Sequence, residues 1–218
     1  MFIQLDGQVL FYEKSGEGKP VIMLHGNGED HHIFDSLSAA LADEYEIYAL
    51  DSRGHGGSST AKEYHYSDMA GDVINFIEAL HLDHPYILGF SDGAIVALMV
   101  AMARGDLING IISCGANLSP KGLTFGARSD IKKMYKLDPN PIIKMMMDEP
   151  NINESDLRNI QVPAIIIAGS KDMIKDKETK RIAANISNSK LIIMEGHDHS
   201  SYIVNSDLLT DTIREFCI

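Results

Sequence analysis

A serine lies between two glycines in the stretch Gly89-Phe90-Ser91-Asp92-Gly93, which follows a run of apolar residues. The G-x-S-x-G pattern is typical of a sharp turn from a buried strand into a helix, with the serine at its apex. Glycine is needed on both sides because a Cβ atom would clash in so tight a turn. We expect a strained backbone at Ser91 that exposes its Oγ atom. A serine presented in this way could attack a carbonyl carbon and form a covalent acyl intermediate.

An acidic group is needed to orient the base that activates such a serine. Asp172 is the candidate, because it lies just past the carboxyl end of the predicted strand Ala164–Ala168. An aspartate at this place could instead cap a helix or stabilise a turn. Its position after the serine and before the histidines in the chain favours the catalytic role.

Two histidines, His197 and His199, are candidates for the base, and both follow the predicted strand Leu191–Met194. We favour His199, because it lies farther along the loop and is followed by two serines. His197 is then expected to be a loop residue near the site. Asp198 is a poor orienting acid, because a side chain seldom folds back onto the ring of its neighbour in sequence.

Backbone N–H groups are expected to stabilise the negative oxygen that forms during acyl transfer. One donor is the N–H of Asp92, directly after the serine. The other lies in the loop His25-Gly26-Asn27-Gly28, which follows an apolar strand, and Asn27 is the candidate. The side chain of Asp92 is expected only to complement the dipole of the following helix.

Nine histidines, including the pairs His31-His32 and His197-x-His199, raise the question of a metal site. Neither pair has cysteines or carboxylates at a matching spacing, and the chain contains no H-E-x-x-H motif. We therefore expect the chain to need no metal and no cofactor.

Apolar strands alternate with amphipathic helices along the chain, which predicts a mostly parallel sheet with helices on both faces. Asp6-Gly7 predicts a hairpin with a type I′ turn, and hence antiparallel strands at one edge. The predicted strands are Phe2–Leu5, Val9–Tyr12, Val21–Leu24, Glu46–Leu50, Tyr86–Phe90, Ile108–Ser113, Ala164–Ala168 and Leu191–Met194. The predicted helices include Ser36–Glu44, Ser67–Leu80, Asp92–Ala103 and about Asp207–Phe216.

The segment at about 118–160 interrupts this alternation, because it contains no predicted strand. Helical patterns cover only Asp130–Leu137 and Ile142–Met147. The segment is inserted between two strands at the end of the sheet where ligands bind in such folds. We therefore expect one domain, residues 1–218, with a short helical cap.

The composition limits the classes of partner. The net charge of −12 argues against nucleic acid and anionic membranes. No apolar run approaches the ~20 residues of a membrane helix, and the first residues do not resemble a signal peptide. Two cysteines are too few for a disulfide framework, so we expect a cytoplasmic protein. We expect a monomer or small homo-oligomer that binds a small-molecule ester.

Over nearly its whole length the chain resembles the α/β-hydrolase superfamily. The resemblance rests on His25-Gly26-Asn27-Gly28, Asp51-Ser52-Arg53-Gly54-His55-Gly56, Gly89-Phe90-Ser91-Asp92-Gly93, Gly169-Ser170-Lys171-Asp172 and Gly196-His197-Asp198-His199. It implies the α/β-hydrolase fold, and for Asp51, Arg53 and His55 a structural turn without chemistry. The family's strand-x-G-x-G-H pattern also places the base at His199, with Asp198 in place of the usual glycine.

A serine at the turn and the absence of tryptophan speak against the dehalogenases and epoxide hydrolases that resemble this fold. The leading prediction is a carboxylesterase that cleaves small or short-chain esters with Ser91, Asp172 and His199. A thioesterase or a carbon–carbon bond hydrolase could use the same three residues. A small-molecule sensor that keeps the fold but turns over slowly is the alternative from another class.

Overall fold

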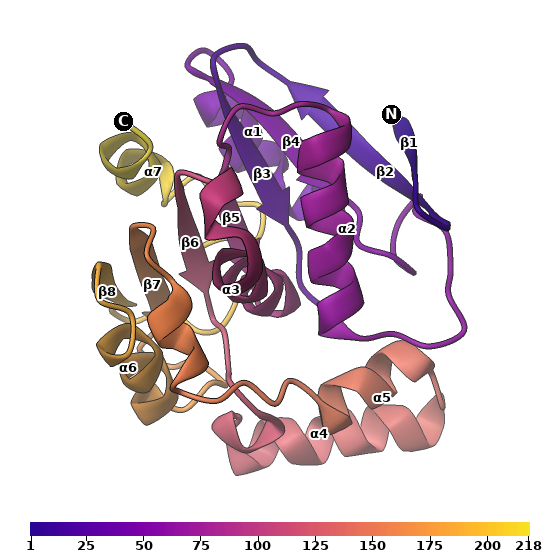
Figure 1. The fold of residues 1–218 in the computed structure, drawn as a ribbon. Helices are drawn as coiled ribbons and strands as arrows, with labels where there is room; N and C mark the ends of the chain where they lie inside the picture. Colours follow the sequence, from indigo (N-terminus) through magenta and orange to yellow (C-terminus); the bar gives the residue numbers. More distant parts are fainter.

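One eight-stranded sheet forms the centre of the computed structural model, which describes residues 1–218, and its strands follow the order β1-β2-β4-β3-β5-β6-β7-β8 (Figure 1). The strands are β1 (Phe2–Leu5), β2 (Gln8–Ser15), β3 (Lys19–Leu24), β4 (Tyr45–Leu50), β5 (Tyr86–Phe90), β6 (Gly110–Cys114), β7 (Ala164–Gly169) and β8 (Ser189–Met194). All eight predicted strands are present. The second strand, β2, exceeds its predicted length by the largest margin, because its last residues pair with β4.

The hairpin at the amino terminus gives the sheet its antiparallel edge, as predicted. Leu5 pairs with Gln8, so Asp6 and Gly7 form a two-residue turn. Only Gly7 has a positive φ, at 72°. The predicted type I′ turn is therefore wrong, because that turn needs a positive φ at both residues and the Cβ atom of Asp6 disfavours it.

The strands from β4 to β8 in the sheet order pair in parallel. Every residue of β5, β6 and β7 is buried. Such strands are covered on both faces, which explains why their sequences are continuous apolar runs rather than alternating ones.

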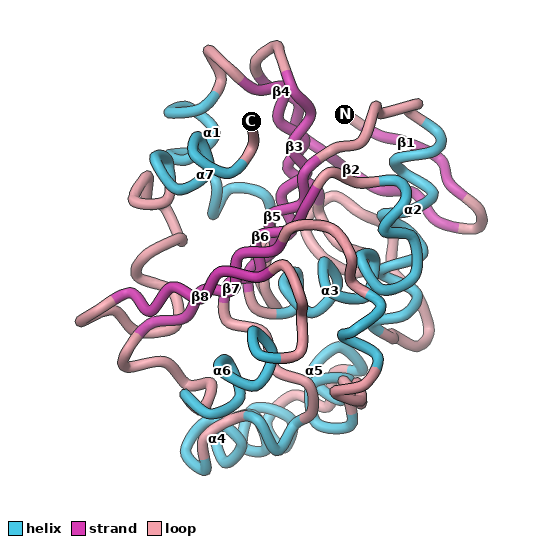
Figure 2. The backbone as a smooth tube through the Cα atoms, turned by 60° about the vertical axis from the view of Figure 1, so that its left-hand side comes forward, coloured by secondary structure: helices cyan, strands magenta, loops and turns pink.

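Helices cover the two faces of the sheet, as Figure 2 shows with the sheet nearly edge-on. One face carries α1 (Asp35–Leu41) and α7 (Thr210–Phe216), and the other carries α2 (Tyr66–Ala79), α3 (Asp92–Arg104) and α6 (Asp176–Ala184). The last helix begins at Thr210 rather than Asp207, and Thr210 Oγ1 donates to the carbonyl of Asp207 in the turn that precedes the helix. No helix is both long and apolar enough to cross a membrane.

The segment expected as a cap contains α4 (Phe125–Leu137) and α5 (Pro141–Asp148). Figure 1 shows the two helices side by side beyond the carboxyl ends of the central strands. Side-chain caps start both helices. Thr124 Oγ1 accepts from the N–H of Ala127 at 3.3 Å, and Asn140 Oδ1 accepts from that of Ile142 at 2.8 Å. Thr124 explains why α4 begins before the predicted pattern, since a capped first turn needs no apolar face.

Candidate active site

Ser91 forms the turn between β5 and α3 with φ 53° and ψ −113°. A side chain on Gly93 would place a Cβ atom 2.1 Å from the carbonyl oxygen of Leu24, and one on Gly89 would lie 2.1 Å from that of Gly93. Both positions therefore require glycine. The backbone around the serine is fixed by the N–H of Ser91, which donates to Cys114 O at 2.8 Å. The turn thus holds Oγ at a defined place at the carboxyl edge of the sheet.

Three side chains from separate loops form a continuous polar chain. His199 Nε2 lies 3.0 Å from Ser91 Oγ, and His199 Nδ1 lies 2.7 Å from Asp172 Oδ1. The Asp172 side chain is 1 % exposed and that of His199 15 %. A carboxylate at Nδ1 favours the tautomer in which Nδ1 carries the proton and Nε2 can accept one.

The loop after β7 orients the carboxylate of Asp172. Its Oδ1 accepts from the N–H of Ile174 at 2.9 Å and its Oδ2 from that of Gly169 at 3.2 Å. Asp172 is therefore held in both position and direction as it meets His199.

His197 and Asp198 support the loop after β8 without contacting Ser91. His197 Nδ1 lies 3.2 Å from Ser201 Oγ. Asp198 Oδ1 accepts from the N–H groups of Ser200 and Ser201, at 3.1 and 2.9 Å. These bonds lower the pKa of Asp198 below its usual value. The structure thus brings His199, and not His197, against Ser91.

The two segments that carry the backbone groups expected to stabilise an oxyanion are joined by a hydrogen bond. The N–H of Gly93 donates to His25 O at 3.1 Å, which joins the start of α3 to the loop after β3. The N–H of Asn27 has no backbone acceptor. That of Asp92 belongs to the first residue of α3, where no preceding helical carbonyl can accept it.

The side chain of Asp92 does more than the expected complement to the helix dipole. It is buried, Oδ1 accepts from the hydroxyl of Tyr66 at 2.6 Å, and Oδ2 accepts from Asn27 Nδ2 at 2.8 Å. Burial raises the pKa of Asp92, and the two hydrogen bonds oppose the rise. Asp92 therefore links α2 to the loop that carries Asn27.

The sequence alone did not indicate Tyr66 as a residue of the site. It is an aromatic residue at the start of an amphipathic helix, where burial in the core is the ordinary expectation. Nothing in the local pattern indicates that its hydroxyl meets a carboxylate 26 positions later.

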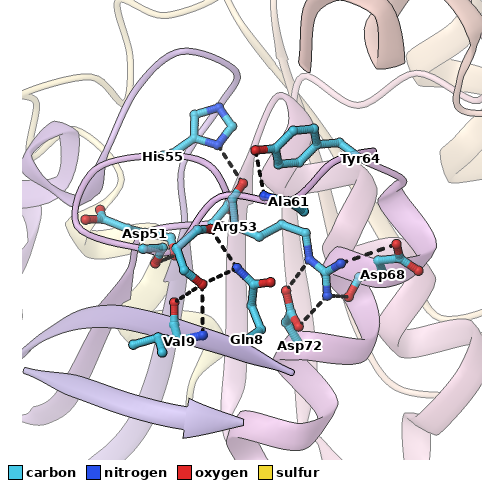
Figure 3. Close-up of polar contacts among 12 residues, drawn as sticks. Gln8, Val9, Asp51, Arg53, His55, Ala61, Tyr64, Asp68 and Asp72 are labelled. Carbon is cyan, nitrogen blue, oxygen red and sulfur yellow. Dashed lines mark hydrogen bonds and ion pairs between the residues drawn. The ribbon is translucent and has the colours of Figure 1, made fainter. Parts of the chain in front are cut away.

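The turn after β4 is structural, as the resemblance implied. The Asp51 side chain is fully buried and accepts from the N–H groups of His31 and Gly57, both at 2.8 Å. Arg53 forms two hydrogen bonds of 2.6 Å to Asp72 of α2. Figure 3 shows these side chains gathered around the turn.

The same turn holds His25 in place. The N–H of Ser52 donates to His25 Nε2 at 3.0 Å, and burial lowers the pKa of His25 to about 4. His25 is therefore neutral at physiological pH. The turn therefore positions the loop that carries Asn27.

Glu29 is a second residue of the site that the sequence alone did not indicate. It lies in the loop that carries Asn27, and its Oε2 atom accepts from the N–H of Gly26 at 3.0 Å. This bond folds the carboxylate back toward Ser91. An acidic residue three positions after Gly26, in the loop that directly follows β3, is the sequence signal that could have indicated it.

Asp30, His31 and His32 offer potential metal-ligand atoms that all lie within 4.8 Å of one another. Of these, His31 is already paired through Nδ1 with Asp51 Oδ1 at 2.8 Å. None of the three belongs to the chain of Ser91, His199 and Asp172. That the protein needs no metal stays a prediction.

Comparisons with known proteins agree with this architecture. The family model described as "alpha/beta hydrolase fold" matches residues 19–137. The AB hydrolase superfamily protein YisY of Bacillus subtilis is 26% identical, over 95% of this chain and 94% of its own length. A pimeloyl-[acyl-carrier protein] methyl ester esterase of Neisseria meningitidis is also 26% identical, over 91% of this chain and 93% of its own.

The solved structure of an esterase from Exiguobacterium antarcticum superposes with a TM-score of 0.85, over 99% of this chain and 98% of that one, at 22% identity. The family model covers more than half of the sequence, including β3 to β6 and the turn at Ser91. The chain belongs to the α/β-hydrolase fold family.

Proposed function

We propose that the protein is a carboxylesterase that cleaves small or short-chain esters through an acyl-enzyme intermediate. The observation that carries this proposal is the unbroken chain of hydrogen-bond distances from Asp172 through His199 to Ser91, 2.7 and 3.0 Å long. The esterase relative from Neisseria meningitidis supports the same class of reaction.

In the first step, Ser91 Oγ attacks the carbonyl carbon of the ester. His199 Nε2 takes the hydroxyl proton as the Oγ–C bond forms, and Asp172 stabilises the imidazolium that results. The ring needs no large movement, because its two nitrogen atoms already face their partners.

The carbonyl oxygen becomes negatively charged in the tetrahedral intermediate. We assign the N–H groups of Asn27 and Asp92 as its donors. The hydrogen bond between the Asn27 and Asp92 side chains joins the two donor segments and limits their relative movement. Donors fixed before the reaction stabilise the charge without reorganisation.

The intermediate then collapses, and His199 returns its proton to the leaving alcohol. A water molecule, activated by the same histidine, attacks the acyl carbon and frees the acid and Ser91. Each step uses only groups of this chain and the reactants.

We assign the segment 118–160 as a small cap over the substrate. Its helices α4 and α5 lie beyond the carboxyl ends of the central strands, the same edge from which Ser91, Asp172 and His199 project. A short cap leaves an open site, which suits small esters.

Hydrolysis of p-nitrophenyl esters of increasing acyl length, by the wild-type protein and by Ser91→Ala, tests the proposal. We expect steady turnover of the short esters that is lost in the variant. A single stoichiometric burst without turnover would favour a sensor. No reaction with any ester would contradict the proposal and direct the search to thioesters and carbon–carbon substrates.

A further inference from the structure

Glu29 places a carboxylate beside the serine. A methyl group on Gly26 would lie 2.7 Å from Glu29 Oε2 and 3.0 Å from Ser91 Cβ. The carboxylate oxygen and the side chain of Ser91 therefore both lie directly against Gly26. Glu29 is half-buried, so part of its side chain remains accessible to solvent.

This carboxylate lacks a cationic partner among the protein's permanently charged side chains. Its one side-chain hydrogen bond is to the N–H of Gly26. The charged groups that act on it most are His199, Asp92 and Asp30, and the two aspartates repel it. Burial is the main cause that raises the pKa of Glu29 above its usual value. The two aspartates add to the rise, and the hydrogen bond from Gly26 and the attraction of His199 oppose it.

A negative charge at this place repels the oxyanion that forms on a neutral ester, while it attracts the His199 imidazolium formed in the same step. The oxyanion adds a second negative charge between Asn27 and Asp92, in a partly buried region where charges interact strongly. A substrate that brings a positive charge next to Glu29 offsets the repulsion. It also gains an ion pair that becomes stronger as the oxyanion forms.

We propose that Glu29 forms a subsite for a cationic group and selects esters with an ammonium group close to the scissile carbonyl. This inference rests on the proposed esterase function and names the chemical class of its substrates. The ammonium group can belong to the acyl part or to the alcohol part of the ester, and the two cases are separated by experiment.

Two pairs of esters with matched shapes test the subsite. Glycine ethyl ester and ethyl propionate differ by an ammonium against a methyl group on the acyl side. Acetylcholine and 3,3-dimethylbutyl acetate differ by a quaternary nitrogen against a carbon on the alcohol side. The rate of acid release at constant neutral pH gives kcat and KM for all four without a chromophore.

For the wild-type protein we expect kcat/KM to favour the charged member of at least one pair by about tenfold or more. In Glu29→Gln, which keeps an acceptor for the N–H of Gly26, that preference should disappear. The charged ester should become slower and the neutral ester should change much less, because the variant removes both the repulsion of the oxyanion and the attraction of the His199 imidazolium. A merely structural role for Glu29 would instead lower both rates together.

Glu17→Gln is the matched control, because it removes one negative charge at an exposed position in the loop between β2 and β3. It should keep the preference for the charged ester. If the ratio of kcat/KM for the charged ester to that for the neutral ester is equal in the wild-type protein and in Glu29→Gln, the inference is overturned. The proposed esterase function would still stand. Absence of turnover with all four esters and with p-nitrophenyl esters would instead contradict the proposed function.

Discussion

His199 Nε2 lies 3.0 Å from Ser91 Oγ, although the two residues are 108 positions apart in the chain. The contact joins the turn after β5 to the loop after β8, although two strands, β6 and β7, lie between β5 and β8 in the sheet. Each partner is fixed independently of the other, Ser91 by its backbone and His199 by Asp172. Removing the serine hydroxyl should therefore leave the rest of the site in place.

Ser91→Ala is expected to lower kcat by roughly 10⁴ to 10⁶, by analogy with the loss of a serine nucleophile in other hydrolases. The circular dichroism spectrum and the urea concentration at the unfolding midpoint should stay close to the wild-type values. Alanine and serine have a similar conformational free-energy cost at a positive φ. Steady-state hydrolysis of a short p-nitrophenyl ester is the measurement. Retention of most of the activity would show that another group is the nucleophile.

His199→Ala and His197→Ala should differ widely in activity. The first loses the base and should reduce kcat by about as much as the serine variant does. The second loses a contact to Ser201 on an exposed part of the loop, and should cost far less. The same ester assay compares them, and a reversed order would show that the base has been assigned to the wrong histidine.

Gly93→Ala and Gly71→Ala should change stability in opposite directions. A Cβ atom at Gly93 would lie 2.1 Å from the carbonyl of Leu24, so the variant must shift the backbone or fail to fold. Gly71 lies in α2 with nothing within 4 Å, and alanine there should stabilise the helix by about 1 kcal/mol. Urea denaturation measures both, and a Gly93→Ala protein as stable as wild type would contradict the described turn.

Tyr66→Phe should destabilise the protein by about 1 to 3 kcal/mol, because the buried carboxylate of Asp92 loses one of its two side-chain donors. Tyr135→Phe is the control, since its hydroxyl makes no hydrogen bond in the protein, and it should change the free energy of unfolding by less than about 0.5 kcal/mol. Both values come from urea denaturation at neutral pH. Equal effects in the two variants would mean that the bond to Asp92 contributes no stability.

His25 should make the protein sensitive to acid. Its pKa is about 4 in the folded protein, against about 6.5 for an unperturbed histidine, so folding favours the neutral ring. The resulting stability is fully present above about pH 6.5 and is lost as the pH falls toward and below about 4. The variant His25→Gln should not show this loss of stability at low pH.

The free energy of unfolding, measured between about pH 7 and about pH 4.5 for the wild type and for His25→Gln, isolates this contribution. The wild type should lose up to roughly 2 to 3 kcal/mol more than the variant over this range. Parallel curves for the two proteins would show that His25 is not buried as a neutral ring.

The sheet could be predicted from the sequence because its central strands are covered on both faces, which makes runs such as Ala164–Ala168 wholly apolar. The turn at Ser91 could be predicted because its geometry demands glycine at two fixed positions. The bond between Tyr66 and Asp92 could not, since it depends on how α2 packs against α3. The folding back of Glu29 toward Gly26 likewise arises from the loop conformation, which no periodic pattern encodes.

The segment with α4 and α5 leaves the sheet after β6 and returns to it at β7, its immediate neighbour. The pairing of these strands, from Ile111 with Ala164 to Cys114 with Ile167, is made without any residue of that segment. Residues 122–124 at the start of the segment pair with the loop that carries Asp172, whereas α4 and α5 follow after them. Evolution can therefore lengthen, shorten or exchange these two helices while the reacting groups keep their places. A laboratory graft of α4 and α5 alone offers a direct route to new substrate ranges on an unchanged catalytic frame.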